Sequence, residues 1–427
     1  MKKSLISRFR FFCQSSLRVG WFLAWRQIQR SSKGTTFLII FIMVLTFLNL
    51  VFVSGILSGL VAGSSNAYRS QYSGDLILSN YESKDFINNS SSVIKIMSAL
   101  PEIESITPRL LSGAVVEANY SRKDNFNDNP DSLSSVLTGI DPMAEDEVTN
   151  LSDLIVAGEY LENGDRNQVL VGSSLLSAYS RNTPGDETLD NVDVGDTIRV
   201  RIGDIFKELQ VKGVVKSKIG EVSRRIYMTD KFLRQLIQRP SGNVNEIAAK
   251  LEPGSDPDIV KEELKKTQVC DCAKIETWEE SQGQFFKDIS RTFSLLGNLI
   301  GGIGVAVASI TVFIVVFINA ITRRRYIGIL KGIGICGFSI QISYMIQSLF
   351  YSLSGSIIGS VLLFAFLKPY IDRNPIDFPF SDGILVAPID LTIIRIVILI
   401  AVTIIAGYIP AKIIVNKNTL DSILGRR

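Results

Sequence analysis

Few residues of this chain have the types and spacing that enzyme chemistry requires. The 427 residues include no histidine, which excludes Ser-His-Asp and Cys-His nucleophile pairs, histidine-ligated zinc and the HExxH helix. Ser92 and Lys95 have the S-x-x-K spacing of serine acyl-transfer enzymes, but the sequence contains no SDN or KTG partner for them. We interpret this match as chance and expect no catalytic residues.

Cysteines and acidic residues provide no better site. The four cysteines are too few for a disulfide framework, and the spacing of Cys270 and Cys272 is awkward for a mutual disulfide and insufficient for a metal site. One run of acidic residues consists of Asp141, Glu145, Asp146 and Glu147. It lacks the spacing of an EF-hand calcium site, and we interpret it as a solvated surface. We therefore expect no metal site and no directly bound cofactor.

The chain also lacks the loop with which P-loop enzymes bind ATP. No Gly-Lys dipeptide occurs anywhere, so the Walker A sequence GxxxxGK[ST], with its backbone cradle and its phosphate-binding lysine, is absent. We expect that this polypeptide does not hydrolyse ATP.

Long windows without charge indicate membrane-spanning helices. The composition is 46% apolar, and the mean hydropathy of +0.25 is high for a soluble protein. No charged residue lies between Lys33 and Arg69, whereas about 20 apolar residues suffice to cross a hydrocarbon core of about 30 Å. The fourth window contains Arg395 near its start, where a long basic side chain can reach the headgroups. The predicted spans are residues 37–62, 291–322, 338–367 and 391–410.

The distribution of basic residues predicts the orientation of these spans. Residues 1–36, 323–337 and 411–427 together carry sixteen Lys and Arg side chains and one acid, Asp421. Because the whole chain has a net charge of only +3, the remainder is net negative. The positive-inside rule places the three basic segments in the cytoplasm, and residues 63–290 and 368–390 outside an inner membrane.

Residues 63–290 show the alternating patterns of an α+β domain. We expect strands at 75–78, 112–120, 168–172, 246–251 and 273–277, a hairpin formed by TIRVRIG and KELQVKGVVKS, and helices at 93–100, 230–238, 257–268 and from Ser173 onward. The polar stretch 121–132 is typical of a loop or a hairpin tip. The predicted fold class is an α-helical membrane protein with four transmembrane helices and a large extracytoplasmic α+β domain inserted between helices 1 and 2.

This order of parts resembles the permease subunits of MacB/FtsX/LolC-type ABC transporters, which transmit force rather than form a channel. The most specific match is RRRYIGILKGIG, which follows the second span and is similar to the family's coupling segment RRxEIGxLKAxG. Tyr326 stands where the family usually has Glu, so a salt bridge of that acid cannot be carried over. The resemblance implies ATPase-coupling roles for Arg323, Arg324, Arg325, Ile327, Gly328, Leu330, Lys331, Gly332 and Gly334. Without the resemblance, the basic residues would only set topology.

A second stretch is similar to the lipoprotein-releasing members of that family. Leu137-Thr138-Gly139-Ile140-Asp141-Pro142, followed by Glu145, Val148 and Ile155 to Gly158, resembles the GIDPxxE…V…I…G pattern of LolC/LolE-type permeases. By itself, Gly-Ile-Asp-Pro predicts only a strand that leads into a turn. The resemblance therefore indicates lipoproteins as a cargo class.

Polar and small residues within the predicted spans indicate helix contacts. Asn49 lies near the middle of the first span, where an unpaired amide is costly, so we expect it to face another helix rather than a substrate cavity, although the cavity stays open as an alternative. Gly301 and Gly304 predict close packing of helices or of two permeases. Residues 18–33 predict an interfacial helix with Trp21, Ala24, Trp25 and Ile28 on one face; a plain basic anchor is the alternative.

The resemblance implies a non-enzymatic permease that works with a separate ABC ATPase, which uses the ATP, and with a second copy or a paralogue. Its partners would be membrane lipid and an amphipathic cargo such as a lipoprotein, with a periplasmic carrier, and no nucleic acid. Two alternatives within the family are MacB-like efflux of small molecules or peptides and FtsX-like regulation of cell-wall hydrolases. A sensor or adhesion protein is less economical, because one anchor would suffice for it.

Overall fold

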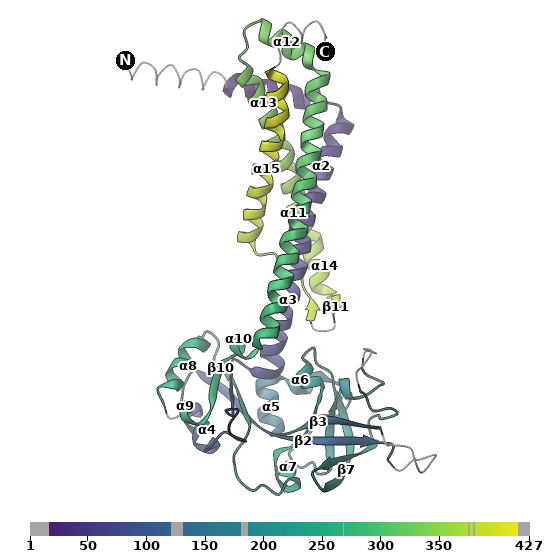
Figure 1. The fold of residues 1–427 in the computed structure, drawn as a ribbon, viewed down its shortest axis with the longest axis vertical. Helices are drawn as coiled ribbons and strands as arrows, with labels where there is room; N and C mark the ends of the chain where they lie inside the picture. Colours follow the sequence, from purple (N-terminus) through teal and green to yellow (C-terminus); the bar gives the residue numbers. More distant parts are fainter. Residues whose placement is uncertain are drawn as a thin grey trace. The chain divides into compact units, whose positions relative to one another are not determined.

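A computed structural model describes residues 17–120, 131–180, 187–267, 269–374, 376–378 and 381–416. The chain divides into two compact units (Figure 1). The helical unit comprises Met1–Val61, Ile289–Asp377 and Gly383–Arg427, and the sheet unit comprises Ala62–Asp288 and Phe378–Asp382. In the order of the chain, most of the sheet unit lies between the first and the second long apolar helix.

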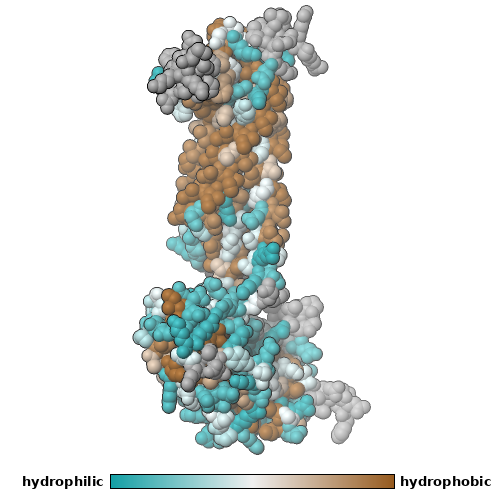
Figure 2. Space-filling model, turned by 60° about the vertical axis from the view of Figure 1, so that its left-hand side comes forward, coloured by the Kyte–Doolittle hydropathy of each residue, from teal (hydrophilic) through white to brown (hydrophobic). Residues whose placement is uncertain are grey.

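Among the described residues, four helices are long and apolar enough to cross a membrane. The first joins α2 (Lys33–Leu48), η1 (Asn49–Val53), α3 (Ser54–Tyr68) and η2 (Arg69–Ser73); the second is α11 (Gly283–Thr322); the third joins α13 (Gly337–Leu362), η5 (Leu363–Leu367) and α14 (Lys368–Arg373); the fourth is α15 (Ile389–Val415). Hydrophobic side chains cover the surface over these helices in Figure 2, whereas hydrophilic ones dominate over the sheet unit. Each predicted span lies within one of these helices, which are longer than the spans.

The helical unit is assembled by close contacts at small residues of α13 and α15. A Cβ atom added to Gly355 would come within 2.4 Å of the Met43 Cβ on α2, and one added to Gly359 within 2.4 Å of the Phe47 ring. Elsewhere on α13, a Cβ on Gly407 of α15 would lie 1.9 Å from the Ser348 hydroxyl oxygen. Close backbone approach at small residues is typical of helix packing in membranes, where no hydrophobic driving force acts between helices.

Over the described residues, the main sheet of the sheet unit has ten strands, and one long strand is shared by its two halves. The strands are β1 (Leu76–Ser79), β2 (Ile103–Ala118), β3 (Asp131–Ile140), β4 (Ile155–Gly158), β5 (Gln168–Gly172), β6 (Thr197–Ile202), β7 (Ile205–Val215), β8 (Arg225–Thr229), β9 (Glu246–Leu251) and β10 (Lys274–Thr277). The first half of β2 pairs with β9, which continues to β1 and β10. The second half closes a ring of pairings in the order β2-β3-β8-β5-β7-β6-β2, with β4 added to β7. We call these the open half and the barrel half.

Helices cover the open half and connect the strands of the barrel half (Figure 1). They are α4 (Ser90–Ser98), α5 (Pro142–Thr149), α6 (Gly220–Ser223), α7 (Asp230–Leu236), α8 (Pro257–Lys265), α9 (Val269–Cys272) and α10 (Trp278–Ser281), with 3-10 turns η3 (Leu151–Leu154) and η4 (Ser173–Leu175). Apolar residues of α4 and α8 pack on β1 and β9 in one core, and a second core fills the barrel half. A two-stranded sheet, β11 (Ile376–Phe378) and β12 (Ser381–Gly383), follows α14.

Several local predictions for this unit need correction. Residues 173–175 form only a 3-10 turn, because the backbone is already extended at Leu176, which forms a β-bridge with Leu189. The expected turn after Ile140 is the start of α5, where the Asp141 carboxylate accepts hydrogen bonds from the Met143 and Ala144 backbone N–H groups. The predicted loop at 121–132 lies outside the described residues, except that 131 and 132 belong to β3.

Candidate functional site

The candidate coupling segment is a short helix, α12 (Arg324–Gly332), that directly follows α11. The helix ends at Gly332 with Ile333 as its C-cap, and Gly334 adopts a positive φ of 92°, which a residue with a side chain would rarely take. Ile327 and Gly328 are buried, and Leu330 packs against the core of the helical unit. These three residues therefore hold α12 in place rather than form its outer surface.

The outer surface of α12 combines positive charge with apolar side chains. Arg324 and Arg325 are exposed, and Tyr326, Ile329 and Ile333 are 68%, 45% and 71% exposed. The spacing of these last three residues, i, i+3 and i+7, places them on one face of a helix. Sequence reasoning missed this exposed apolar face, although the spacing itself is a signal that could have revealed it.

Lys331 makes a contact within the chain. Its ammonium group donates a hydrogen bond to the Val415 carbonyl oxygen at 2.9 Å, and Val415 is the last residue of α15. A cation at the end of a helix also interacts favourably with the helix dipole. Lys331 thus ties α12 to the end of α15, while Gly332 and Gly334 are exposed and Arg323 is half-buried.

Asn49, Gly301 and Gly304 meet where the first apolar helix contacts α11. A Cβ added to Gly304 would lie 2.6 Å from the Asn49 side-chain oxygen, and one added to Gly301 would lie 2.9 Å from a methyl group of Leu50. Asn49 begins η1, a π-helical segment, and a π-bulge is often found at functional positions. The amide lies against α11 and stays partly exposed at the edge of this contact.

The interfacial helix spans 17–29 and packs on α13 through its small residues. Gly20 and Ala24 are buried, and a Cβ on Gly20 would lie 2.7 Å from a methyl group of Ile342. Trp21 and Trp25 are 60% and 50% exposed. The expected apolar face is therefore divided, because Ala24 is buried against the protein whereas the two tryptophans are largely exposed.

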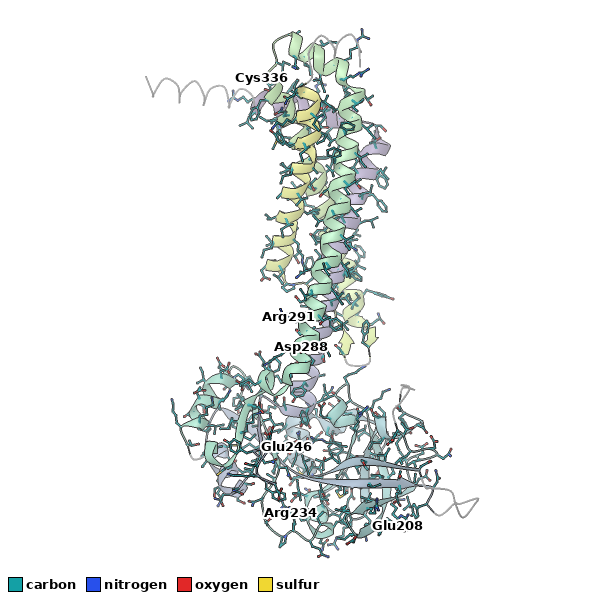
Figure 3. All side chains as sticks on the ribbon, in the orientation of Figure 1. Glu208, Arg234, Glu246, Asp288, Arg291 and Cys336 are labelled. Atoms are coloured by element: carbon teal, nitrogen blue, oxygen red, sulfur yellow. The ribbon has the colours of Figure 1, made fainter. Side chains whose placement is uncertain are left out.

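Within the sheet unit, one predicted acidic surface residue is instead deeply buried. Glu145 is 2% exposed, and its carboxylate binds the guanidinium group of Arg109, which is 1% exposed. Arg225 and Glu246 form a second buried pair nearby; Glu246 is labelled in Figure 3. Sequence reasoning missed Arg109, Arg225 and Glu246. Among the described residues, no group of three or more metal-ligating side chains occurs.

The electrostatics of these buried pairs favour the charged forms. Burial opposes the charge of both arginines, but the Glu145 carboxylate beside Arg109 and the Glu246 carboxylate beside Arg225 outweigh it and raise their pKa values. For Glu246, burial acts to raise the pKa, and the Arg225 guanidinium has the larger combined effect, so the pKa lies below its usual range. Arg109, Arg225 and Glu246 therefore remain charged at neutral pH.

Comparison with known proteins agrees with this arrangement. Residues 36–267 match the family described as MacB-like periplasmic core domain, and residues 298–419 match the FtsX-like permease C-terminal family. This chain belongs to the MacB/FtsX-type ABC transporter permeases. The first match contains nearly all of the first apolar helix and most of the sheet unit, and the second contains most of α11 and all of α12, α13 and α15. The predicted family is thereby confirmed.

Individual relatives are distant. An uncharacterized ABC transporter permease of Methanocaldococcus jannaschii is 23% identical over 212 residues, which cover 49% of this chain and 50% of that protein. The match thus spans about half the length of that curated relative. The crystal structure of the periplasmic region of MacB from Actinobacillus actinomycetemcomitans aligns with 48% of this chain and 90% of its own, at 16% identity and a TM-score of 0.35.

Proposed function

We propose that this MacB/FtsX-type permease converts ATP hydrolysis by a separate ATPase into movement of its sheet unit, which lies outside the cytoplasm. Two permeases, identical or paralogous, would work with two ATPase subunits. Family membership implies the ATPase partner. The asymmetry of basic residues supports cytoplasmic positions for both termini and for α12.

The observation that carries this proposal is the outer surface of α12. A short helix between two membrane spans exposes three apolar side chains, Tyr326, Ile329 and Ile333, together with two arginines. Exposed apolar side chains beside charge are typical of a protein interaction site rather than of a solvated linker. The buried Ile327 and the bond from Lys331 to α15 support the transfer of motion from α12 to the spans.

Charge reversal on α12 tests this coupling. The permease carrying Arg324→Glu and Arg325→Glu is reconstituted with its ATPase in lipid vesicles, and ATP hydrolysis is measured with and without the permease. We expect loss of permease-dependent ATPase stimulation, because the positive surface of the docking helix becomes negative. Arg373→Glu, an exposed arginine at the end of α14, is the matched control. Unchanged stimulation in the double variant would contradict the proposal.

For the cargo, we propose an amphipathic molecule such as a lipoprotein. Support comes from the resemblance of the stretch 137–158 to lipoprotein-releasing permeases. Two of its residues also have structural roles, since Asp141 caps α5 and Glu145 binds Arg109. Release of a labelled lipoprotein from vesicles that contain the complex tests the proposal. Retrieval of a cell-wall hydrolase by the intact complex, without lipoprotein release, would instead favour the FtsX-like role.

A further inference from the structure

Five buried side chains surround the end of the first apolar helix where it enters the sheet unit. We call them the joint cluster: Tyr72 of η2, Arg109 of β2, Glu145 of α5, Arg225 of β8 and Glu246 of β9. All five are less than 10% exposed. The cluster holds two positive and two negative groups, and its members come from five separate elements that are far apart in the sequence.

The first contact in the cluster joins β2 to α5. The Arg109 Nη2 atom lies 2.7 Å from Glu145 Oε1, and its Nε atom lies 2.9 Å from Glu145 Oε2. The hydroxyls of Thr107 and Thr149 donate to the same carboxylate at 2.8 and 3.0 Å. A bidentate arginine–carboxylate pair whose oxygens are all hydrogen-bonded permits little rotation. It therefore fixes the orientation of α5 relative to β2.

The second contact includes Tyr72, which lies at the end of the first apolar helix. The Arg225 guanidinium binds both Glu246 oxygens at 3.0 and 3.1 Å, and the Tyr72 hydroxyl donates to Glu246 Oε1 at 3.1 Å. Two guanidinium groups lie near the Tyr72 ring, with the Arg109 and Arg225 Cζ atoms 5.2 and 5.1 Å from its centroid. Arg109 also donates to the Tyr72 carbonyl oxygen at 2.7 Å. Tyr72 is thus held through its ring, its hydroxyl and its backbone.

Buried ion pairs are a costly way to stabilise a fold. Apolar side chains of similar size often give equal or greater stability, whereas charged pairs impose one geometry. The open half is joined to η2 directly by the polypeptide chain, because its strand β1 begins at Leu76, three residues after the end of η2. The barrel half has no such direct connection. It meets the helix end through Arg225 of β8, through α5, which follows β3, and through the Ser217 hydroxyl, which donates to the Gln71 side-chain oxygen at 2.6 Å. Tyr72 also packs in an apolar cluster with residues of the barrel half. Among these contacts, the ion pairs are the ones that impose a single geometry.

A neighbouring set of contacts joins the two long helices at the same place. The Tyr68 hydroxyl donates to the Ser281 carbonyl oxygen at 3.1 Å, and Ser65 contacts Gln282. Arg69 pairs with Asp75 and lies over the Trp278 ring. Within the sheet unit, the end of α3 is therefore connected to the segment that leads into α11.

We propose that the joint cluster is a rigid coupling that makes the barrel half of the sheet unit follow the end of the first apolar helix. The inference rests on the proposed function, since it assigns the step by which helix movement reaches the outer domain. Arg109 and Glu145 are positioning residues in this scheme. Their role is to transmit displacement, and their contribution to stability is secondary.

The test removes one ion pair of the joint cluster without leaving either partner as an unpaired buried charge. The double variant Arg109→Met with Glu145→Met removes both partners, which keeps a buried site neutral and is expected to preserve folding. Spin labels are placed on cysteines introduced at Phe206 in the barrel half and Ile259 on α8, both more than half exposed, after the four native cysteines are replaced by serine. The full complex in lipid nanodiscs is measured with and without ATP.

In the parent protein we expect a narrow distribution of the 206–259 distance that ATP leaves unchanged. The melting temperature of the double variant should stay within a few degrees of the parent value, and its ATPase rate should be unchanged. The width of its 206–259 distance distribution should at least double. Tyr72→Phe, which keeps the ring and loses one hydroxyl, should give an intermediate width. The control Lys250→Met with Glu104→Met removes an exposed pair from β9 and β2 and should change nothing.

A narrow distribution in both joint variants would overturn the inference, as would equal broadening in the exposed-pair control. The distance width is measured without cargo and does not depend on transport. Failure of the proposed function would instead appear as an absence of permease-dependent ATPase stimulation in the parent protein, so the two failures are distinguishable.

Discussion

The two units of this permease fill their interiors in different ways. The sheet unit buries charged groups that are paired and hydrogen-bonded, such as Arg109 with Glu145. The helical unit joins its helices through glycines and hydroxyls, such as Gly355 against Met43, and among its described helices it has two π-helical segments, η1 and η5. Paired charges specify one arrangement, whereas small residues allow close approach with few directional bonds. The difference agrees with the proposed function, in which the helices shift and the attached domain keeps its shape.

The largest effect should follow from leaving one charge of the joint cluster unpaired. Arg109→Met alone leaves Glu145 buried without its counterion, which costs about 3–5 kcal/mol. Native-state hydrogen exchange of β2 and β3 peptides in the full-length protein measures the loss separately from the helical unit. Lys250→Met, in the exposed pair with Glu104, is the control and should cost no more than about 1 kcal/mol. Equal losses in both variants would remove the distinction between the two kinds of pair.

The next effect concerns the helical unit. Gly355→Val places a side chain 2.4 Å from the Met43 Cβ and about 3 Å from its backbone, so α2 and α13 must separate. We expect a loss of about 1–3 kcal/mol, typical of overpacking, and faster exchange in α2 and α13. Gly302→Val on α11 is the matched control, since nothing lies within 4 Å of its added Cβ. Similar destabilisation by both variants would argue against close packing at Gly355.

These contrasts also explain what the sequence could and could not predict. The spans were predictable because absence of charge over about 20 residues is a local property. The joint cluster was not, because Arg109, Glu145 and Glu246 are separated by 36 to 137 positions and no local pattern marks their pairing. Glu145 stood within an acidic run, so its burial could be known only from the position of β2.

The candidate coupling segment was less predictable from the sequence than the spans and more predictable than the joint cluster. Its basic residues and glycines identified α12, but the resemblance gave no direction for individual side chains. Ile327 therefore appeared among the coupling residues although it faces the core, and Tyr326 was treated only as a departure from the family pattern although it is 68% exposed. Helical spacing around Ile329 carries this information once the helix bounds are known.

A smaller, pH-dependent effect distinguishes the sheet unit. Because the folded-state pKa of Glu246 lies below its usual range, its ionisation stabilises the fold above the unfolded-state pKa, and this contribution is lost as pH falls through the folded value. We expect the exchange stability of β9 to decline below the normal carboxylate range. Glu246→Gln should lower stability at neutral pH and flatten the decline, whereas Glu104→Gln should leave it unchanged. A slope that Glu246→Gln does not alter would assign the acid sensitivity to other carboxylates.

The smallest effect is expected at a buried hydroxyl of α13, and it has the opposite sign. The Ser356 hydroxyl is 1% exposed and has no hydrogen-bond partner among the described residues. Ser356→Ala removes this unsatisfied group, so the helical unit should keep or gain stability, by up to about 1 kcal/mol, in exchange measurements on α13. Ser90→Ala in the sheet unit is the control, because its hydroxyl donates to Ile87 and accepts from Val244. Ser90→Ala should lower the free energy of unfolding by about 1 kcal/mol. A comparable loss at Ser356 would show that the hydroxyls of α13 are bonded in the membrane, and the two interiors would then differ in charge alone.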